Sequence, residues 1–541
     1  MPREIVTVEI GQCGLQLGSR FWELALAEHQ KAQQQSQQQS SQQSKSHQSS
    51  LESSLSHLYD DPATTFFDID NSGNLSARAV LIDTELGVLS AINKSKHSAL
   101  YSSNNSNIVS DVSGAGNNFA HGHFLYGPQL EESFANSIQS EVEKCDSLQS
   151  FMIVHSTGGG TGSGLGSYVQ DWLADSYPAI YRFDNCILPS DNDDVITSPY
   201  NATLCLDRII ASADAVMPCD NQALIDICQK YSRGSLANNK KSVGGGFRDL
   251  NLLCASALSS LTAGMRFGGE LNVDINDLIM NLIPQPQFKF LIPGLSPIHT
   301  IFNNAENNKI SNQTTKTSNT TNNYQRNKIS SNSLSNIPVP HPTQLFHTLA
   351  MAKQVSSSRV SVAAQSIAVN DGKAPPIQSL ASSLNKTSNS SLKSLDATFS
   401  SSLNKSSQLI EIDLTKGVYL TSSFLCRGES LSFGLLQRQI SLLTPSMEFA
   451  YHKNSSLQSS SIKLGLCSQS STDSPLTVLS LANSSAIASR IDFLTHRARS
   501  LFTRKAHFHH YTECGLEEQQ MIDAIETLQE VSKQYKLTEK M

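Results

Sequence analysis

The chain of 541 residues lacks several features that would place it at once in a common class. It has no basic excess, because 40 lysines and arginines stand against 47 aspartates and glutamates, whereas nucleic-acid-binding domains usually carry a basic face. No apolar run approaches membrane-spanning length, and the charged N-terminus lacks a signal peptide's apolar core. The ten cysteines form no Cys-x-x-Cys pair, which favours reduced thiols. We therefore expect a soluble, cytoplasmic protein of several domains that binds neither nucleic acid nor membrane.

The sequence also lacks a lysine where many phosphate-binding loops have one. Its glycine-rich stretch, residues 158–166, holds six glycines in nine positions, but no Gly-Lys-Ser/Thr closes it as in a Walker A loop. No Gly-x-Gly-x-x-Gly can be placed there, which disfavours a nicotinamide-dependent dehydrogenase. A phosphate would then depend on backbone amides and on the hydroxyls of Thr157, Thr161 and Ser163. A flexible Gly/Ser loop is the alternative interpretation.

Units of strand, loop and helix recur along the first half of the chain. Short apolar runs predict strands at 4–10, 77–82, 151–154 and 186–188. Apolar residues at helical spacing predict helices from 14 to about 29 and at 129–147, 164–175, 201–212 and 221–231. This alternation predicts an α/β fold with a doubly wound parallel sheet and a ligand above the carboxyl ends of its strands.

Three tracts rich in Gln, Ser, Asn or Thr interrupt this pattern. Residues 30–57, 303–337 and 352–409 have too few apolar side chains to form a core, so we expect inserted, disordered segments. The remainder divides into a first domain at 1–246 and a second at 247–484, which contains a long helix at 250–265 and a strand at 417–425. Residues 485–541 show helical periodicity and predict a C-terminal helical layer.

Further polar groups stand at the ends of the predicted strands. Asp83 and Glu85 follow a strand, where carboxylates can reach Mg²⁺ directly or through water, although a solvated turn is the alternative. The two glycines in residues 114–118 permit a nest of amides, and Asn117 can donate to a phosphate oxygen.

Two other groupings have a structural alternative. Asp274 and Asp277 stand three apart at a predicted helix start, where plain N-capping would explain them. His507, His510 and Cys514 share one helical face, but no fourth metal ligand lies nearby in the sequence.

Residues 158–164, Gly-Gly-Gly-Thr-Gly-Ser-Gly, resemble the signature of the tubulin family, and five loops appear along the chain in the order that tubulins use. The resemblance implies a tubulin/FtsZ-like fold with a GTPase domain, a central helix, a second α/β domain and C-terminal helices. It implies GTP or GDP as ligand, with Mg²⁺ at Asp83 and Glu85. The implied nucleotide-binding residues are Gln12, Cys13, Gly114, Ala115, Gly116, Asn117, Ser156, Gly158, Gly159, Gly160, Thr161, Gly162, Asp194, Asn221, Phe247 and Asn251.

The resemblance also implies roles at the base. Asp194 would contact the ribose, while Asn221 and Asn251 would contact guanine. Phe247 would stack on the base where most tubulins have Tyr, although without the resemblance a core position is the better interpretation. Leu15 stands where most tubulins have Asn, so one polar contact would be missing.

Residues 269–274, followed by Asp277, resemble the loop by which one tubulin completes the GTPase site of its neighbour. Asp274 and Asp277 would then be catalytic, orienting the water that attacks GTP held by the next subunit. The hydrolysis-competent member of the family has Glu at the position of Asp277. Two alternatives stay open: slow hydrolysis across the interface, or a GTP-bound structural cap or adapter that does not hydrolyse.

Several local features resemble the ε class of the family. Ser198 replaces an acidic residue, a polar insert separates Tyr231 from Phe247, and His510 stands where α- and β-tubulins have Trp. The run at 181–201 is also similar to that class. This implies a cytoskeletal protein of centrioles, basal bodies and cilia that assembles with α-, β- or δ-tubulin in doublet and triplet microtubules.

Overall fold

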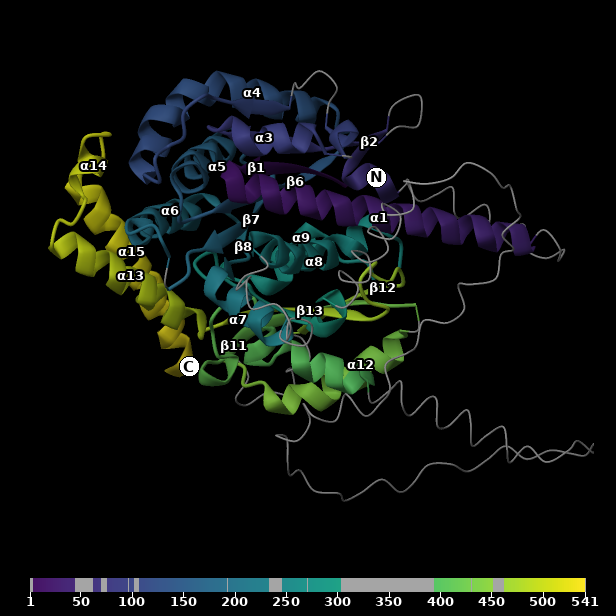
Figure 1. The fold of residues 1–541 in the computed structure, drawn as a ribbon. Helices are drawn as coiled ribbons and strands as arrows, with labels where there is room; N and C mark the ends of the chain where they lie inside the picture. The colour runs from purple at the N-terminus through teal and green to yellow at the C-terminus, as the bar shows by residue number, and fades with distance from the viewer. Residues whose placement is uncertain are drawn as a thin grey trace, which may run out of the picture. The chain divides into compact units, whose positions relative to one another are not determined.

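The structure is a computed structural model that describes residues 3–43, 62–69, 75–95, 97–101, 107–191, 193–232, 246–269, 271–302, 394–429, 431–450 and 462–540. Its larger sheet has seven parallel strands in the order β5-β4-β1-β6-β7-β8, with β9 beside β7. Figure 1 labels β1, β6, β7 and β8 of this sheet. The strands are β1 (Glu4–Ile10), β4 (Ala79–Asp83), β5 (Ile108–Ser110), β6 (Leu148–Ser156), β7 (Tyr181–Leu188), β8 (Ala215–Val216) and β9 (Cys219–Asp220). The predicted doubly wound parallel sheet is confirmed.

Helices cover both faces of this sheet, which is why its central strands are continuous apolar runs. On one face, α1 (Gly11–Gln43), α3 (Leu86–Asn93) and α8 (Gly246–Arg266) share a core with β1 and β6. On the other face, α4 (Gly127–Glu143) and α5 (Gly166–Ser176) bury Phe134 and Val169 against Val8. Single π-helical turns, η3 (His121–Tyr126) and η4 (Thr161–Leu165), precede α4 and α5.

A second, mixed sheet lies on the far side of α8. It runs β10-β13-β11-β12, with β10 (Ile292–Ser296), β11 (Tyr419–Arg427), β12 (Ile462–Cys467) and β13 (Thr477–Ser484). Leu253 of α8 shares one core cluster with Leu425 and Leu479 of this sheet, so α8 is the buried central helix that the sequence predicts. The helices α9 (Ile275–Leu282) and α12 (Phe433–Leu443) belong to the same part, and a small hairpin joins β2 (Phe67–Ile69) to β3 (Leu75–Ala77).

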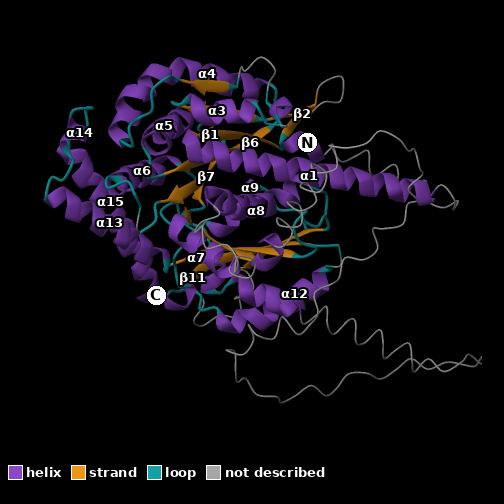
Figure 2. Cartoon of the chain, viewed as in Figure 1, coloured by secondary structure: helices purple, strands orange, loops and turns teal. Residues whose placement is uncertain are grey.

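The predicted C-terminal helices are confirmed as α13 (Ile487–Thr503), α14 (His509–Thr512) and α15 (Glu518–Leu537). In Figures 1 and 2 they lie along one side of the molecule, beside α6 (Ser198–Ser212). The remaining helix of the first part is α7 (Asn221–Ser232). Across the ranges described, no helix is long and apolar enough to cross a membrane. The division into three domains stays a prediction, because residues up to 307 and from 398 onward cluster as one compact unit.

The first low-complexity tract was predicted to be disordered from residue 30, and this is wrong for its first part. Helix α1 continues to Gln43, because glutamine and alanine favour helix and a helix already nucleated by packing extends at little cost. Lys31 Nζ donates to Ser470 Oγ at 2.8 Å, and Gln35 Nε2 donates to Glu429 Oε1 at 3.0 Å. Residues 44–57 lie outside the described part.

The tract at 352–409 was also predicted as an insert without structure, and its end corrects this. Phe399 and Leu409 are fully buried. The Leu409 N–H donates to the Pro293 carbonyl at 2.9 Å, and the Leu409 carbonyl accepts from Asp220 N–H at 2.8 Å. A few apolar side chains dock this segment although its average composition is polar. Residues 303–337 and 352–393 lie outside the described part.

Candidate functional site

Five of the predicted loops meet at one edge of the larger sheet. The strands are parallel, so the segments that follow β1, β4, β5, β6 and β7 all leave from their carboxyl ends. β1 lies between β4 and β6, so the chain order reverses there and the sheet has its switch point beside the glycine stretch. Ligands of open α/β sheets bind at this position.

Contacts between the loops confirm that they adjoin. Gly11 has φ +72°, and a Cβ there would lie 3.0 Å from the Gly162 nitrogen, so only glycine allows this approach. The Thr84 and Thr161 hydroxyl oxygens are 2.7 Å apart. Gln12 is exposed in the first turn of α1, and Leu15 is buried in the core rather than facing a ligand.

Two of the three hydroxyls of the glycine loop donate to backbone carbonyls of the chain itself. Thr157 Oγ1 donates to the Ile187 carbonyl at 3.2 Å, and Ser163 Oγ donates to the Gly159 carbonyl. Both side chains are fully buried. The sequence prediction that three hydroxyls hold the phosphate is therefore corrected: Thr161 and the backbone amides remain.

A buried ion pair that the sequence analysis missed supports this loop from beneath. His155 of β6 has Nδ1 2.7 Å from the Gly162 carbonyl and Nε2 2.9 Å from Asp184 Oδ2. Both neighbours are acceptors, so both nitrogens must carry a proton and the ring is an imidazolium. Asp184 accordingly raises the pKa of His155 well above its ordinary value, against the effect of burial. The sequence signal for this ion pair was a polar residue in each of two apolar strands, His155 in β6 and Asp184 in β7.

The two predicted magnesium ligands lie at the end of β4. Asp83 is buried, which raises its pKa to about 6, and its Oδ2 has no hydrogen-bond partner among the described residues. A Cβ on Gly114 would collide with Glu85 Oε1, so Glu85 points to the loop at 114–118. A buried, unpartnered carboxylate oxygen next to the predicted phosphate loop fits a hard cation.

The predicted base-binding residues are spread over three elements. Asp194 is exposed after β7, Asn221 begins α7, and Asn251 lies half-buried in α8. Phe247 is 66% exposed, so the interpretation as a core residue is wrong and its ring is accessible to a ligand. Burial raises the pKa of Cys13 to about 12, with the Cys219 thiol adding to the shift, so Cys13 is a neutral thiol.

Asp274 and Asp277 lie at the opposite edge of the sheet. Asp274 caps α9 by accepting from Asp277 N–H at 2.7 Å, and it pairs with Arg3. Arg3 precedes β1, whereas Gln12 follows it. Seven residues of strand separate the two, which is roughly 20 Å. Neither aspartate can reach the nucleotide loops of its own chain.

The capping alternative for Asp274 is thus seen in the structure, and Asp277 is the less constrained of the two. The Asp277 side chain is 40% exposed, and its Oδ1 lies 3.9 Å from Lys463 Nζ of β12. The residues His507, His510 and Cys514 belong to no metal-binding cluster within the described ranges.

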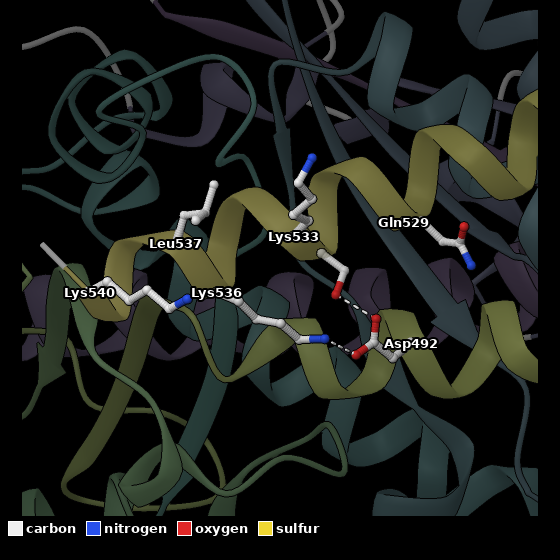
Figure 3. Close-up of a pocket in the computed structure, with 7 residues that line it drawn as sticks. Asp492, Gln529, Lys533, Lys536, Leu537 and Lys540 are labelled. Atoms are coloured by element: carbon white, nitrogen blue, oxygen red, sulfur yellow. Dashed lines mark hydrogen bonds and ion pairs between the residues drawn. The ribbon is translucent and has the colours of Figure 1, made fainter.

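A cavity of about 310 Å³ lies elsewhere, between α13 and α15. Asp492, Lys533 and Lys536 are among its lining residues, and Lys536 pairs with Asp492 there (Figure 3). None of its lining residues belongs to the predicted nucleotide loops.

Comparisons with known proteins agree with this arrangement. The family model described as "Tubulin/FtsZ family, GTPase domain" matches residues 4–229. The chain is 29% identical to the tubulin epsilon chains of Mus musculus and of Homo sapiens, over 98% of this chain and 95% of each relative. It is 36% identical to the tubulin beta chain of Porphyra purpurea, over 55% of this chain and 60% of the relative. The matched GTPase domain implies a guanine nucleotide, and residues 4–229 form a GTPase domain of the tubulin/FtsZ family.

Proposed function

We propose that this chain is a GTP-binding cytoskeletal tubulin that joins head-to-tail with other tubulins and completes GTP hydrolysis on its neighbour. One observation carries the proposal: the nucleotide loops and Asp277 lie at opposite edges of one sheet, linked through Arg3, β1 and Gln12. A residue that cannot reach its own site serves a second molecule if the two edges face each other. Such a head-to-tail contact joins unlike surfaces and builds a polymer.

The proposed nucleotide site uses the edge at the ends of β1, β5 and β6. Gln12 and the amides of 114–117 and 158–162 would contact phosphates. The Thr161 hydroxyl could donate to a phosphate while it accepts from Thr84. Asp194 would contact the ribose, and Phe247, Asn221 and Asn251 the base. The exposure of Phe247 supports a stacking role, because a free aromatic face can cover a base.

Asp83 and Glu85 would hold Mg²⁺ directly or through water. The unpartnered Oδ2 of Asp83 and the direction of Glu85 toward Gly114 support this assignment. The ion, when bound, would neutralise charge on the transferring phosphate.

In the proposed reaction Asp274 and Asp277 have different roles. Asp274 is held by its cap and by Arg3, so it positions the first turn of α9. The Asp277 carboxylate is partly exposed and would accept a proton from the attacking water above the neighbour's γ-phosphate. Lys463 competes for that carboxylate until the neighbour docks.

The similarity to tubulin epsilon chains covers nearly the whole of both sequences, which supports an ε-like role. We therefore propose that the chain acts at centrioles or basal bodies, with α-, β- or δ-tubulin, in doublet and triplet microtubules.

A second function is a GTP-bound cap or adapter at microtubule ends that does not hydrolyse. Two features favour it: aspartate is one methylene shorter than the glutamate of the hydrolysing family member, and Asp277 pairs with Lys463. A shift of about 1 Å in a catalytic group can cost on the order of 100-fold in rate.

The full chain should first be purified and its bound nucleotide and copurifying tubulins identified. We expect GDP or GTP in about equal molar amount to the protein, together with at least one other tubulin. Bound NAD(H), or a chain that copurifies with no nucleotide and rejects added GTP, would contradict the proposal.

A further inference from the structure

Asn201, which the sequence analysis did not single out as a site residue, joins both phosphate loops to the C-terminal helices. It lies in the first turn of α6 and is fully buried. Its Nδ2 donates to the carbonyls of Asn117 and Gly158, each at 2.8 Å. Its Oδ1 accepts from Phe119 N–H at 2.9 Å. One side chain thus spans the loop after β5 and the loop after β6.

The fourth partner comes from α14. Tyr511 donates its hydroxyl hydrogen to Asn201 Oδ1 at 2.6 Å, while the alternative acceptor, the Thr197 carbonyl, is 3.5 Å away. Tyr511 is 1% exposed. Burial raises the pKa of Tyr511 above its ordinary value, so the hydroxyl keeps its proton and remains a donor.

These four contacts admit a single orientation of the amide. If the amide were flipped, its oxygen would face two carbonyl oxygens and its NH₂ group would face the Phe119 N–H. Tyr511 adds a hydrogen bond to Oδ1 and so holds Asn201 in this orientation. Asn117 has φ +52°, in the left-handed region that few non-glycine residues adopt. The bond from Asn201 to the Asn117 carbonyl helps to hold that conformation.

We propose that Asn201 positions both phosphate loops, and that Tyr511 of α14 orients Asn201 so that nucleotide retention depends on the C-terminal helical layer. The inference rests on the proposed nucleotide site. It goes further by giving the C-terminal segment a part in holding the nucleotide.

The contacts favour one loop over the other. Two of the three loop contacts of Asn201 reach residues 117–119, and one reaches Gly158. Residues 114–118 resemble the loop that holds the γ-phosphate in tubulins. Loss of the Tyr511–Asn201 hydrogen bond should therefore weaken the binding of GTP more than the binding of GDP. A general loss of stability would weaken the binding of both nucleotides alike.

The chain offers a matched control. Tyr200 is the neighbour of Asn201 on α6. Its hydroxyl forms a second bond between α6 and the C-terminal segment, donating to the Ala506 carbonyl at 3.1 Å. That bond touches neither phosphate loop. Tyr511→Phe and Tyr200→Phe each remove one hydroxyl group and keep the ring.

The test measures dissociation of fluorescent GTP and GDP analogues from the purified full chain, with the melting temperature of each variant. Tyr511→Phe should release GTP about fivefold faster, the effect of one neutral hydrogen bond, and GDP less so. Tyr200→Phe should release both as the wild type does. Asn201→Asp keeps the acceptor and loses both donor contacts, so it should release GTP faster than Tyr511→Phe does.

If Tyr511→Phe and the wild type release the nucleotides at equal rates, the proposed role of Tyr511 is wrong, while the proposed function is unaffected. Equal acceleration by both tyrosine variants would also overturn the role of Tyr511, since the effect would then be general destabilisation. A wild-type chain that binds neither analogue would overturn the proposed function and the role of Tyr511 together.

Discussion

Single residues support the proposed phosphate loop of this chain, which has no lysine. The glycines were recognisable in the sequence because their number and spacing serve the backbone. The supporting residues His155 and Asn201 were not, because their partners Asp184, Gly162 and Tyr511 come together only in the fold. The hydroxyls of Thr157 and Ser163 looked available for the same reason, and the fold uses them internally.

The His155–Asp184 pair yields a prediction on stability. His155→Gln would leave Asp184 as a buried charge without its cation, so we expect a loss of about 3 kcal/mol in the free energy of unfolding. Because the folded pKa of His155 is raised, its contribution is full below about 6.5 and falls as the pH rises through the folded value. Urea unfolding at several pH values measures this. A loss that grows with pH would contradict the imidazolium assignment.

Glu9 of β1 yields a second prediction, in which the substitution stabilises the chain relative to the wild type as the pH rises. It is fully buried, and burial raises its pKa from 4.5 to about 8, although Trp22 Nε1 donates to it at 2.7 Å. The folded chain therefore keeps a proton that the unfolded chain loses, so stability falls as the pH rises between these values.

Glu9→Gln keeps the acceptor for Trp22 and removes the titration. Its stability relative to wild type should rise by about 1.4 kcal/mol per pH unit between pH 5.5 and 7.5. Urea unfolding of both proteins at these two pH values measures the difference. A constant difference would show that Glu9 is ionised in the folded chain.

At the scale of elements, periodicity predicted most helices and the central strands. Helix α8 was recognisable as a long apolar pattern, and Asp274 as the residue before α9. The prediction of disorder from low-complexity composition was wrong at the start of the first tract and at the end of the third. Glutamines extend α1 in the first, and Phe399 and Leu409 dock a serine-rich segment in the third. Average composition predicts neither helix propagation nor the packing of two isolated apolar side chains.

The extension of α1 is testable by hydrogen exchange. Amides at 31–35 should exchange at least about tenfold more slowly than a random coil, because the helix continues and Lys31 and Gln35 are bonded to residues from the second sheet's loops. Gln34→Pro, which costs about 3 kcal/mol in a helix interior, should abolish the protection, while Gln34→Ala should keep it. Coil-like exchange in the wild type would restore the prediction of disorder from residue 30.

At the scale of the whole molecule, the sheet separates the proposed nucleotide-binding edge from an edge that carries Asp277. The sequence indicated both groups of residues, but only the parallel order of the strands shows that they lie apart. This polarity underlies the proposed polymer: each chain would present its α9 edge to the nucleotide of the next. An enzyme with an internal active site would need both groups at one edge.

The most direct test of this account is GTP turnover in mixtures of the chain with purified α/β-tubulin, under conditions where the two assemble. The wild type and the adjacent control Asn276→Ala should hydrolyse GTP slowly above the rate of α/β-tubulin alone. Asp277→Ala should lose at least about tenfold of that excess, and Asp277→Glu should raise it. Equal excess turnover by Asp277→Ala and wild type would contradict hydrolysis in trans by Asp277.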